Sequence, residues 1–252
     1  MTVPKGLLTG RVVVVTGASR GIGRVLARSF GAAGASLGLL ARNATAIKEL
    51  AAELPGPCVP VSCDVSDADA VAEAFAAIAG ELGAVDSVVA NAGIAPESHR
   101  AHQLSVATWR QVLEVNLTGT FLTAQAAHPY LAASRRGRLV LTSSVMARLP
   151  RRGLSAYAAS KAGIEGLARA LAADWAGDRI CVNAVAPGFV DSGLGNAFLA
   201  NERLHAQVTG RTAAGRFGYT DELAATTGFL ASDAAGYLTG QTVAVDGGYG
   251  LG

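Results

Sequence analysis

Residues 12–23 read V-V-V-V-T-G-A-S-R-G-I-G, an apolar run that leads directly into three closely spaced glycines. Four consecutive valines without a polar interruption are typical of a buried central strand in a parallel sheet. We expect Gly17 to permit a tight turn, Gly21 to let a phosphate approach and Gly23 to pack a following helix closely on the strand. Such a turn aims backbone N–H groups and the positive end of the helix at an anion, although its G-x-x-x-G-x-G spacing differs from the usual dinucleotide fingerprint. The stretch predicts a nucleotide-binding α/β fold.

The rest of the chain repeats this alternation of short apolar strands and helices. Strands are expected at Val12–Thr16, Leu37–Leu40, Val59–Cys63, Val85–Ala90, Arg138–Thr142, Ile180–Ala186 and Gln241–Val245. Helices are expected from the glycine turn to about Ala33, at Ala44–Leu54, Ala68–Leu82 and Val106–Leu131, from Ser155 to about Trp175, and at Ala197–Val208 and Asp221–Leu230. The pattern predicts one domain over residues 1–252: a Rossmann-like, doubly wound parallel sheet of about seven strands with helices on both faces.

Composition excludes several classes of protein. The chain has 252 residues, of which 50% are hydrophobic and 16% charged, so we expect a compact globular protein rather than a disordered one. A net charge of +2 gives no reason to expect nucleic acid or an anionic membrane as a partner. Three cysteines without a C-x-x-C motif, and no signal-like or membrane-spanning segment, favour a soluble protein of the reducing cytoplasm that holds no metal.

The end of the second expected strand bears on the choice of cofactor. A protein that binds NAD would place an acidic residue about 20 residues after the glycine turn, on the ribose 2′-hydroxyl. This chain has Ala41-Arg42-Asn43 there, and Arg20 lies inside the turn. Two guanidinium groups could hold a 2′-phosphate by charge-assisted hydrogen bonds, which favours NADP(H). The alternative is that both arginines are only solvated surface residues.

Polar or small residues follow two further strands. Asp64 comes directly after the third strand, where ligands bind in open α/β sheets, so its carboxylate could face the adenine. It could equally cap the next helix, and Asp67 competes for that role. Asn91-Ala92-Gly93 follows the fourth strand, and its small side chains would leave room for a cofactor.

The helix that begins at Ser155 carries Tyr157 and Lys161 four residues apart, on one face and one turn from each other. An ammonium beside a phenol favours the phenolate, so we expect the pKa of Tyr157 to be lowered, which would suit a residue that transfers a proton. The alternative is an exposed pair on an amphipathic helix. A second helix contains N-L-T-G at Asn116–Gly119, and both Asn and Gly are unfavourable inside a helix, which predicts a local distortion there.

Together these segments resemble the single-domain branch of the short-chain dehydrogenase/reductase family, in the family's order and over nearly the whole chain. The resemblance implies a catalytic set of Asn116, Ser144, Tyr157 and Lys161, in which Ser144 lies thirteen residues before Tyr157. It also implies that Pro187-Gly188, with Ser192 where many members have Thr, holds the nicotinamide carboxamide. The residues that it implies for cofactor binding are Gly17, Ser19, Arg20, Gly21, Ile22, Gly23, Arg42, Asn43, Asp64, Val65, Asn91, Ala92, Gly93, Tyr157, Lys161, Pro187, Gly188, Val190 and Ser192.

The resemblance further implies that NADPH reduces a ketone to a secondary alcohol with Tyr157 as proton donor, in a homotetramer. Residues 191–216 are expected to form a lid over the small-molecule substrate, and the four histidines to be structural or solvent-facing. Three alternatives stay open: a secondary-alcohol or sugar dehydrogenase, a 3-oxoacyl-[acyl-carrier-protein] reductase, and a cofactor-binding regulator without turnover. The carrier-protein alternative is disfavoured. Carrier proteins are acidic, and carrier-dependent reductases of this family have one basic residue before the fifth strand and another before the sixth. Here Arg135 matches the first position, but the second is Asp178, which would repel the carrier.

Overall fold

The strands of the computed structural model, which describes residues 3–191 and 201–251, form one sheet in the order β3-β2-β1-β4-β5-β6-β7. Every neighbouring pair is parallel. The strands are β1 (Val12–Thr16), β2 (Ser36–Ala41), β3 (Cys58–Ser62), β4 (Ser87–Ala90), β5 (Arg138–Thr142), β6 (Cys181–Pro187) and β7 (Thr242–Val245). The strand order reverses between β1 and β4, which is where open α/β sheets bind ligands. The predicted doubly wound topology is confirmed.

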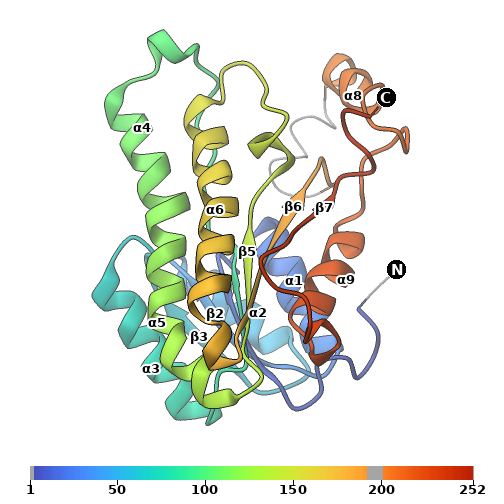
Figure 1. The fold of residues 1–252 in the computed structure, drawn as a ribbon. Helices are drawn as coiled ribbons and strands as arrows, with labels where there is room; N and C mark the ends of the chain where they lie inside the picture. The colour runs from blue at the N-terminus through green and yellow to red at the C-terminus, as the bar shows by residue number, and fades with distance from the viewer. Residues whose placement is uncertain (1–2, 192–200, 252) are drawn as a thin grey trace.

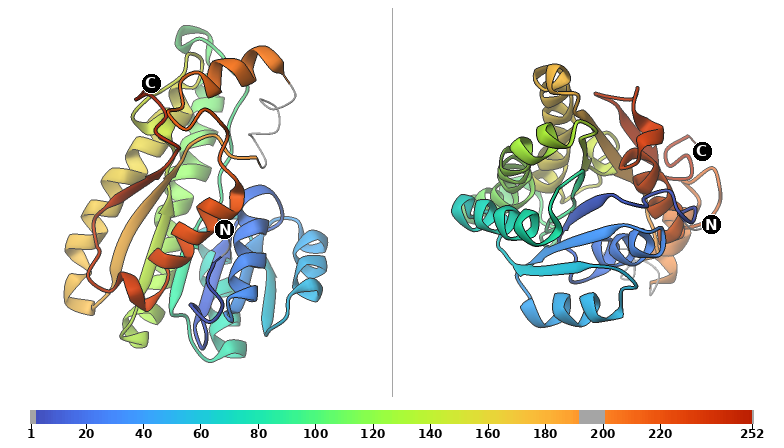
Figure 2. Two further views of the ribbon diagram at one scale, coloured as in Figure 1. Left: turned by 90° about the vertical axis from the view of Figure 1, so that its right-hand side faces the viewer. Right: turned by 90° about the horizontal axis from the view of Figure 1, so that it is seen from below.

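Helices cover both faces of this sheet (Figures 1 and 2). They are α1 (Gly21–Ala32), α2 (Ala44–Glu53), α3 (Ala68–Leu82), α4 (Val106–Leu113), α5 (Gly119–Ser134), α6 (Ser155–Asp174), α8 (Glu202–Thr209) and α9 (Thr220–Leu230). In Figure 1, α5 and α6 lie in front of the sheet, with α1 and α2 behind it. No described helix is long and apolar enough to cross a membrane.

Each face of the sheet has its own apolar core. On one side, Phe75 and Ile78 of α3 pack with residues of α5 and α6 against the sheet. On the other, Leu26 and Phe30 of α1 pack with residues of α2 and α9. All five residues of β1 are buried, as the run of valines predicts, because this strand has a helix layer on each face.

One predicted helix is interrupted. The expected continuous helix over Val106–Leu131 consists of α4, a π-helical turn at Glu114–Thr118, and α5. The turn carries the Asn116 and Gly119 region that predicted a distortion. A Cβ added at Gly119 would lie 2.8 Å from Val65 Cγ2, so this position admits only glycine without a shift of its neighbour.

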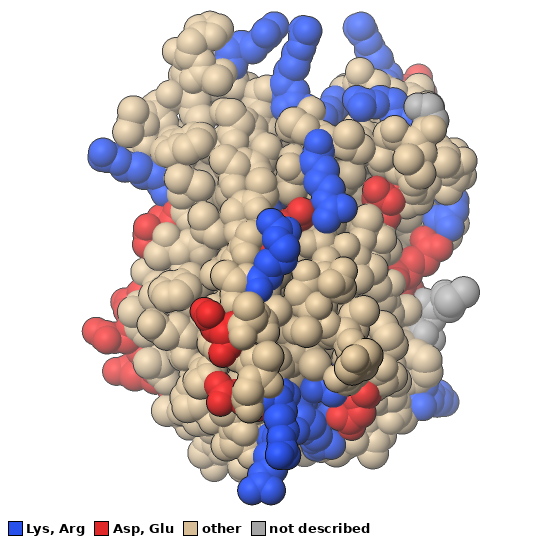
Figure 3. All heavy atoms as spheres, in the orientation of Figure 1, with Lys and Arg blue, Asp and Glu red and all other residues tan. Residues whose placement is uncertain are grey.

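The amino ends of the strands carry a buried polar network around Arg11, whose residue exposure is 1%. Its guanidinium donates to the hydroxyl of Ser87, to the backbone oxygens of Asp86 and Arg136, and to the carboxylate of Asp233. The buried carboxylate of Asp86 accepts from the Val12 N–H and pairs with Arg136. Figure 3 shows basic side chains at this end and projecting along the opposite end.

Candidate active site

The four predicted catalytic residues meet at the carboxyl ends of the central strands. Ser144 follows β5, while α6 carries Tyr157 and Lys161 on one face. Lys161 Nζ lies 5.7 Å from the centroid of the Tyr157 ring, and Ser144 hydrogen-bonds the Tyr157 hydroxyl. A Cβ added at Gly93 would lie 3.2 Å from Asn116 Oδ1 and 3.6 Å from Lys161 Nζ. Residues from four segments of the chain therefore converge on one small region.

Asn116 is fully buried and uses its side-chain amide to join these segments. Its Oδ1 accepts from the Ile94 N–H at 2.8 Å, and its Nδ2 donates to the Ile94 carbonyl at 2.9 Å. Nδ2 also donates to Ser160 Oγ at 3.1 Å, and Ser160 Oγ donates to the Tyr157 carbonyl at 2.7 Å. The π-helical turn thus fixes the loop after β4 to the helix that carries Tyr157.

The electrostatics of the Tyr–Lys pair differ from the expectation. Burial raises the pKa of Tyr157, and the hydrogen bond with Ser144 only partly opposes that rise. The sequence predicted a lowered pKa, which is wrong for this structure because the pattern shows a neighbouring ammonium but not how far both groups are removed from water. Burial also lowers the pKa of Lys161 to about 8. Its Nζ donates to the Thr142 carbonyl at 2.7 Å.

Several supporting residues escaped the sequence analysis. Ser143 Oγ donates to the Lys161 carbonyl at 3.1 Å and to Glu165 Oε1 at 3.3 Å. Glu165 Oε2 accepts from Arg148 Nε at 3.1 Å. This buried carboxylate of α6 therefore contacts residues before and after Ser144, namely Ser143 and Arg148. The signal for Glu165 is its position one turn beyond Lys161 on the same helix face. No local sequence pattern predicts the role of Ser160, because its partner Asn116 lies 44 residues away in the chain.

The glycine turn lies beside this cluster and fits the diphosphate of a dinucleotide. Gly17 has φ +69°, and a Cβ there would lie 2.9 Å from Ala92 Cα. A Cβ at Gly23 would lie 2.3 Å from the Gly17 carbonyl oxygen. Thr16 Oγ1 accepts from the N–H groups of Asn91 and Ala92, both at 3.0 Å. These contacts bring the turn and the N-A-G loop together, as a shared ligand site requires.

At the end of β2, Arg42 is 70% exposed and its Nη1 lies 3.7 Å from Asp64 Oδ2. Arg20 is also exposed. Asn43 caps α2 by accepting from the Ala46 N–H.

The question of which acid caps α3 is decided by the contacts. Asp67 accepts from the N–H groups of Asp69 and Ala70 and is the cap. Asp64 instead accepts from the hydroxyl and N–H of Ser66, which lower the pKa of its carboxyl group with help from Arg42. It therefore remains at the strand end, where the adenine was expected.

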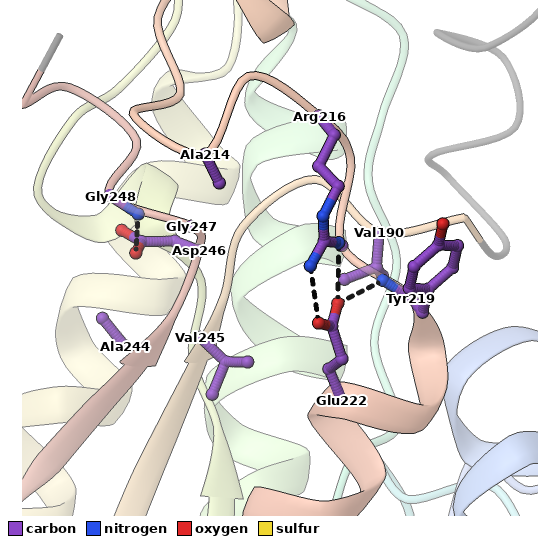
Figure 4. A pocket seen from close by; sticks show the side chains of 11 residues that line it. Val190, Ala214, Arg216, Tyr219, Glu222, Ala244, Val245, Asp246, Gly247 and Gly248 are labelled. Carbon is purple, nitrogen blue, oxygen red and sulfur yellow. Dashed lines mark hydrogen bonds and ion pairs between the residues drawn. The ribbon is translucent and has the colours of Figure 1, made fainter. Parts of the chain in front are cut away.

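The segment after β6 leads into a cavity of about 350 Å³ (Figure 4). A Cβ at Gly188 would lie 2.6 Å from Asp246 Cα, so Pro187-Gly188 runs close to the end of β7. Val190 lines the cavity, together with the bidentate ion pair between Arg216 and Glu222. The predicted catalytic residues are not among its lining residues, so this cavity does not form the reactive centre. Ser192 and residues 192–200 of the expected lid lie outside the described part of the chain.

The residues weighed for carrier docking lie far from the catalytic cluster. Arg135 precedes β5 and Asp178 precedes β6, whereas Ser144 follows β5. Strand directions therefore place Arg135 and Asp178 at the amino end of the sheet, about 16 Å or one strand length away at ~3.3 Å per residue.

Two of the four histidines contact neighbouring side chains. His128 Nε2 lies 2.9 Å from Asp178 Oδ2, and His205 stacks on Phe217 with ring centroids 5.1 Å apart. Within residues 3–191 and 201–251, no three His, Cys, Asp or Glu side chains are grouped to hold a metal ion.

Known proteins resemble this chain over nearly its whole length. Residues 17–250 match the family described as Enoyl-(Acyl carrier protein) reductase. A cis-4-hydroxycyclohexanecarboxylate dehydrogenase from Sinomonas cyclohexanicum is 39% identical, with 95% of this chain and 96% of that protein covered. A galactitol 2-dehydrogenase from Cereibacter sphaeroides is 40% identical, covering 96% of each chain. A 3-oxoacyl-[acyl-carrier-protein] reductase from Thermotoga maritima is 35% identical, covering 96% of this chain and 98% of its own.

Solved structures of similar proteins have the same fold as this chain. A putative gluconate dehydrogenase from Agrobacterium tumefaciens has a TM-score of 0.92 at 34% identity, covering 97% of this chain and 98% of its own. A 3-oxoacyl-[acyl-carrier protein] reductase from Brucella melitensis, solved with bound NAD, has a TM-score of 0.89 at 35% identity, covering 98% of this chain and 94% of its own. The fold and site define an oxidoreductase that acts on alcohol or ketone groups with a nicotinamide cofactor. The chain belongs to the short-chain dehydrogenase/reductase family.

Proposed function

We propose that this protein uses NADPH to reduce a ketone to a secondary alcohol. The observation that carries the proposal is the convergence of Ser144, Tyr157 and Lys161 beside a glycine turn at the carboxyl ends of the strands. The bound cofactor would supply the hydride that reduces the carbonyl carbon. A raised pKa keeps Tyr157 protonated at neutral pH, which is the state that a proton donor in the reductive direction needs.

The chain's own groups then divide the remaining work. Ser144 would hold the carbonyl oxygen and stabilise the negative charge that develops on it. Tyr157 would give its proton to that oxygen. Lys161 would hold the nicotinamide ribose, and its charge would stabilise the phenolate left behind. Asn116 would hold the loop that follows β4 in place against α6. It would also support the water that returns protons to Lys161.

The cofactor would lie across the glycine turn and the strand ends. The residues proposed to hold it are Gly17, Ser19, Arg20, Gly21, Ile22, Gly23, Arg42, Asn43, Asp64, Val65, Asn91, Ala92, Gly93, Tyr157, Lys161, Pro187, Gly188, Val190 and Ser192. Arg42 is exposed, and its 3.7 Å separation from Asp64 is too long for a hydrogen bond, so its guanidinium is accessible to a 2′-phosphate.

The test of this proposal compares NADPH with NADH. We expect kcat/KM to be at least about tenfold higher with NADPH, since a charge-assisted contact is worth about 1.5–3 kcal/mol. Arg42→Asp should abolish that preference and leave turnover with NADH in place. Arg169→Asp, which makes the same charge change on exposed α6 surface, is the matched control. Equal kcat/KM for the two cofactors in the unmodified protein would refute NADPH as the cofactor.

A sugar-alcohol or secondary-alcohol dehydrogenase is the second candidate, because a D-threitol dehydrogenase and a galactitol 2-dehydrogenase are among the relatives. Relative turnover with NADP⁺ and NADPH separates the two. A carrier-bound 3-oxoacyl substrate is disfavoured by Asp178, whose carboxylate would repel an acidic carrier. A large preference for the carrier form over a small thioester, lost at high salt, would reverse that judgement. A regulator without turnover would have no use for the Tyr157 proton.

The proposal includes a homotetramer in the cytoplasm. Large apolar side chains are exposed on α4 and α5, at Trp109 and Phe121, and near the edge strand β7, at Phe229 and Tyr237. Exposed aromatic residues of this kind are typical of subunit contacts. A monomer in solution scattering would contradict the assembly but not the chemistry.

A further inference from the structure

Glu165 is a carboxylate of α6 that the proposed chemistry leaves without a task. Only 7% of the residue is exposed, and it lies one helical turn beyond Lys161 on the same face of the helix. Packing alone does not require a charge at such a place, because an apolar side chain of similar size avoids the cost of taking a carboxylate out of water. What the carboxylate provides instead is two hydrogen-bond acceptors at a fixed separation.

These two oxygens bind the two ends of one turn, residues 143–148, which we call the serine turn. Oε1 accepts at 3.3 Å from Oγ of Ser143, the residue that follows β5. Oε2 accepts at 3.1 Å from Nε of Arg148, the residue that follows the 3₁₀ helix at Val145–Ala147. Ser144, which is predicted to hold the substrate carbonyl, lies between the two contacts. One carboxylate therefore holds both ends of the segment that carries this serine.

The backbone of the serine turn is held to β6 and to itself. The N–H of Ser143 donates to the Val185 carbonyl at 2.8 Å, and the Ser144 carbonyl accepts from the Ala147 N–H at 2.9 Å. These bonds set the shape of the turn, whereas the contacts with Glu165 set its place against α6.

The place of the serine turn matters because Ser144 and Tyr157 come from different segments of the chain. Their hydroxyls are hydrogen-bonded, although Ser144 lies thirteen residues before Tyr157. A displacement of about 1 Å between reacting groups can lower a rate about 10²-fold. The hold of α6 on the serine turn therefore bears directly on whether both hydroxyls meet the same carbonyl oxygen.

We propose that Glu165 is a positioning residue for the reduction. Its carboxylate holds the serine turn against α6 and thereby keeps Ser144 Oγ beside the Tyr157 hydroxyl. It touches neither the substrate nor the cofactor and takes no part in proton transfer. This inference rests on the proposed function for its kinetic consequences, whereas the contact between the two hydroxyls can be observed without turnover.

The first experiment is Glu165→Met, measured with NADPH and ethyl 3-oxobutanoate as the probe ketone. The variant removes both acceptors and should lower kcat about tenfold while KM stays within about twofold, since Ser144 acts on charge that develops in the transition state. The midpoint of urea unfolding should not fall, because the Arg148 side chain is 56% exposed and Ser143 Oγ still donates to the Lys161 carbonyl. A kcat within about twofold of the unmodified protein would overturn the inference.

Two further variants show whether the carboxylate contacts themselves are responsible. Glu165→Gln can still accept from Arg148 and donate to Ser143, so it should regain most of the lost kcat. Glu53→Met is the matched control, because it removes the same charge from a carboxylate that pairs with two arginines of α1, and it should leave kcat unchanged. An equal loss of kcat in Glu53→Met would show an effect of charge alone and would overturn the inference.

The Ser144→Ala background separates positioning from general stability. If Glu165 acts through Ser144, Glu165→Met should lower kcat no further once that hydroxyl is gone. Loss of one such donor costs about 10²–10³-fold, which leaves measurable activity. The same loss in both backgrounds would show that Glu165 acts on the whole site or the whole fold, and would overturn the inference. Arg148→Gln, whose changed side chain lies at the surface, decides by the same comparison if Glu165→Met does not fold.

A readout without turnover distinguishes failure of this inference from failure of the proposed function. In protein labelled with ¹³C at tyrosine Cζ, the Tyr157 signal is the one of five that Tyr157→Phe removes. Ser144→Ala should shift this signal, because the phenol loses its hydrogen-bond partner, and Glu165→Met should shift it in the same direction. An unshifted signal in Glu165→Met would overturn the inference. Failure of the unmodified protein to reduce any ketone with either nicotinamide nucleotide would refute the proposed function, while the spectrum would still test the contact.

Discussion

Arg11 at the amino end of the sheet and Lys161 at the carboxyl end are both buried cations, but they differ in the partners that surround them. At the amino end, Arg11 is 1% exposed and donates to Ser87, to two backbone carbonyls and to the carboxylate of Asp233. At the carboxyl end, Lys161 is 4% exposed and donates to the Thr142 carbonyl, without an ion pair to any carboxylate of the described residues. Burial lowers the pKa of both side chains, but only Arg11 has acidic partners that oppose the shift.

This difference in partners indicates that the amino end of the sheet stabilises the fold, whereas the carboxyl end is available to a ligand. We call them the stability end and the functional end. A buried charge is costly unless hydrogen bonds and opposite charges replace the lost water. The Arg11 network makes that replacement within the protein. Lys161 is left with one hydrogen bond, so its remaining N–H groups are available to a partner that the protein does not itself supply. Four predictions test this contrast between a stability end and a functional end.

The largest expected effect is at the functional end. Tyr157→Phe removes the proton donor, so turnover should fall about 10³-fold, within the range for loss of a general acid, or about 4 kcal/mol in activation free energy. Binding of NADPH, followed by nicotinamide fluorescence, should survive. Retention of most activity would mean that the proton comes from another group.

The converse effect is expected at the stability end. Arg11→Met keeps the length and the apolar stem but leaves Ser87 and two backbone carbonyls without their donor. The free energy of unfolding should fall by about 3 kcal/mol, while kcat/KM changes by less than about twofold. Arg28→Met is the control, because it removes one of the two arginines paired with exposed Glu53 and should leave the free energy of unfolding nearly unchanged. Loss of activity in folded Arg11→Met would break the contrast.

The third effect is a dependence of stability on pH. Burial lowers the pKa of Lys161 from 10.5 to about 8. Between those values the unfolded chain holds the proton and the folded chain does not, so stability rises with pH across that window, and the cost of the buried ammonium is greatest below pH 8. At about 1.4 kcal/mol per pKa unit that cost is at most about 3 kcal/mol.

Lys161→Met removes this cost but leaves the Thr142 carbonyl unpaired, which offsets about 1 kcal/mol. In urea denaturation without cofactor, the variant should therefore be about 2 kcal/mol more stable than the unmodified protein at pH 7. The advantage should shrink between pH 8 and pH 10. If the difference in stability between the variant and the unmodified protein did not change with pH, burial of the Lys161 ammonium would not be costly.

The fold was predictable because its strands follow simple rules. The bounds of β1 and β5 agree with the sequence prediction at both ends, since the apolar runs stop at a glycine turn and at a pair of serines. The Asn and Gly within the expected helix also predicted a distortion near Asn116, and the π-helical turn confirms it. β4 begins at Ser87 rather than at Val85, although the backbone of Asp86 still hydrogen-bonds Val12 and Arg138 on the neighbouring strands.

The candidate site was predictable in its members but not in its environment. Spacing alone indicated that Tyr157 and Lys161 lie one turn apart, as they do. The direction of the Tyr157 pKa depends on burial, which spacing does not report. The contact of Ser160 with Asn116 joins positions that no local pattern connects. The distance of Arg135 and Asp178 from the site does follow from strand direction, and becomes evident once the sheet is known to be parallel.

The smallest effect compares one serine from each end. Ser160 Oγ joins Asn116 to the Tyr157 carbonyl, and Ser134 Oγ donates to the carboxylate of Asp86. The Ser160 variant loses two neutral hydrogen bonds and the Ser134 variant loses one to a carboxylate, so each Ser→Ala change should cost about 2 kcal/mol of stability.

Their kinetics should differ, because only Ser160 fixes a residue of the predicted catalytic set. Ser160→Ala should lower kcat about threefold to tenfold, with the KM for NADPH nearly unchanged, since Asn116 loses one of its three hydrogen bonds. Ser134→Ala should leave kcat unchanged at equal loss of stability. If both variants lowered kcat alike, activity would follow global stability, and the separation of the two ends would fail. If neither did, the Asn116–Ser160 contact would be a packing feature, and the positioning of Tyr157 would have to rest on Glu165 and Ser143 alone.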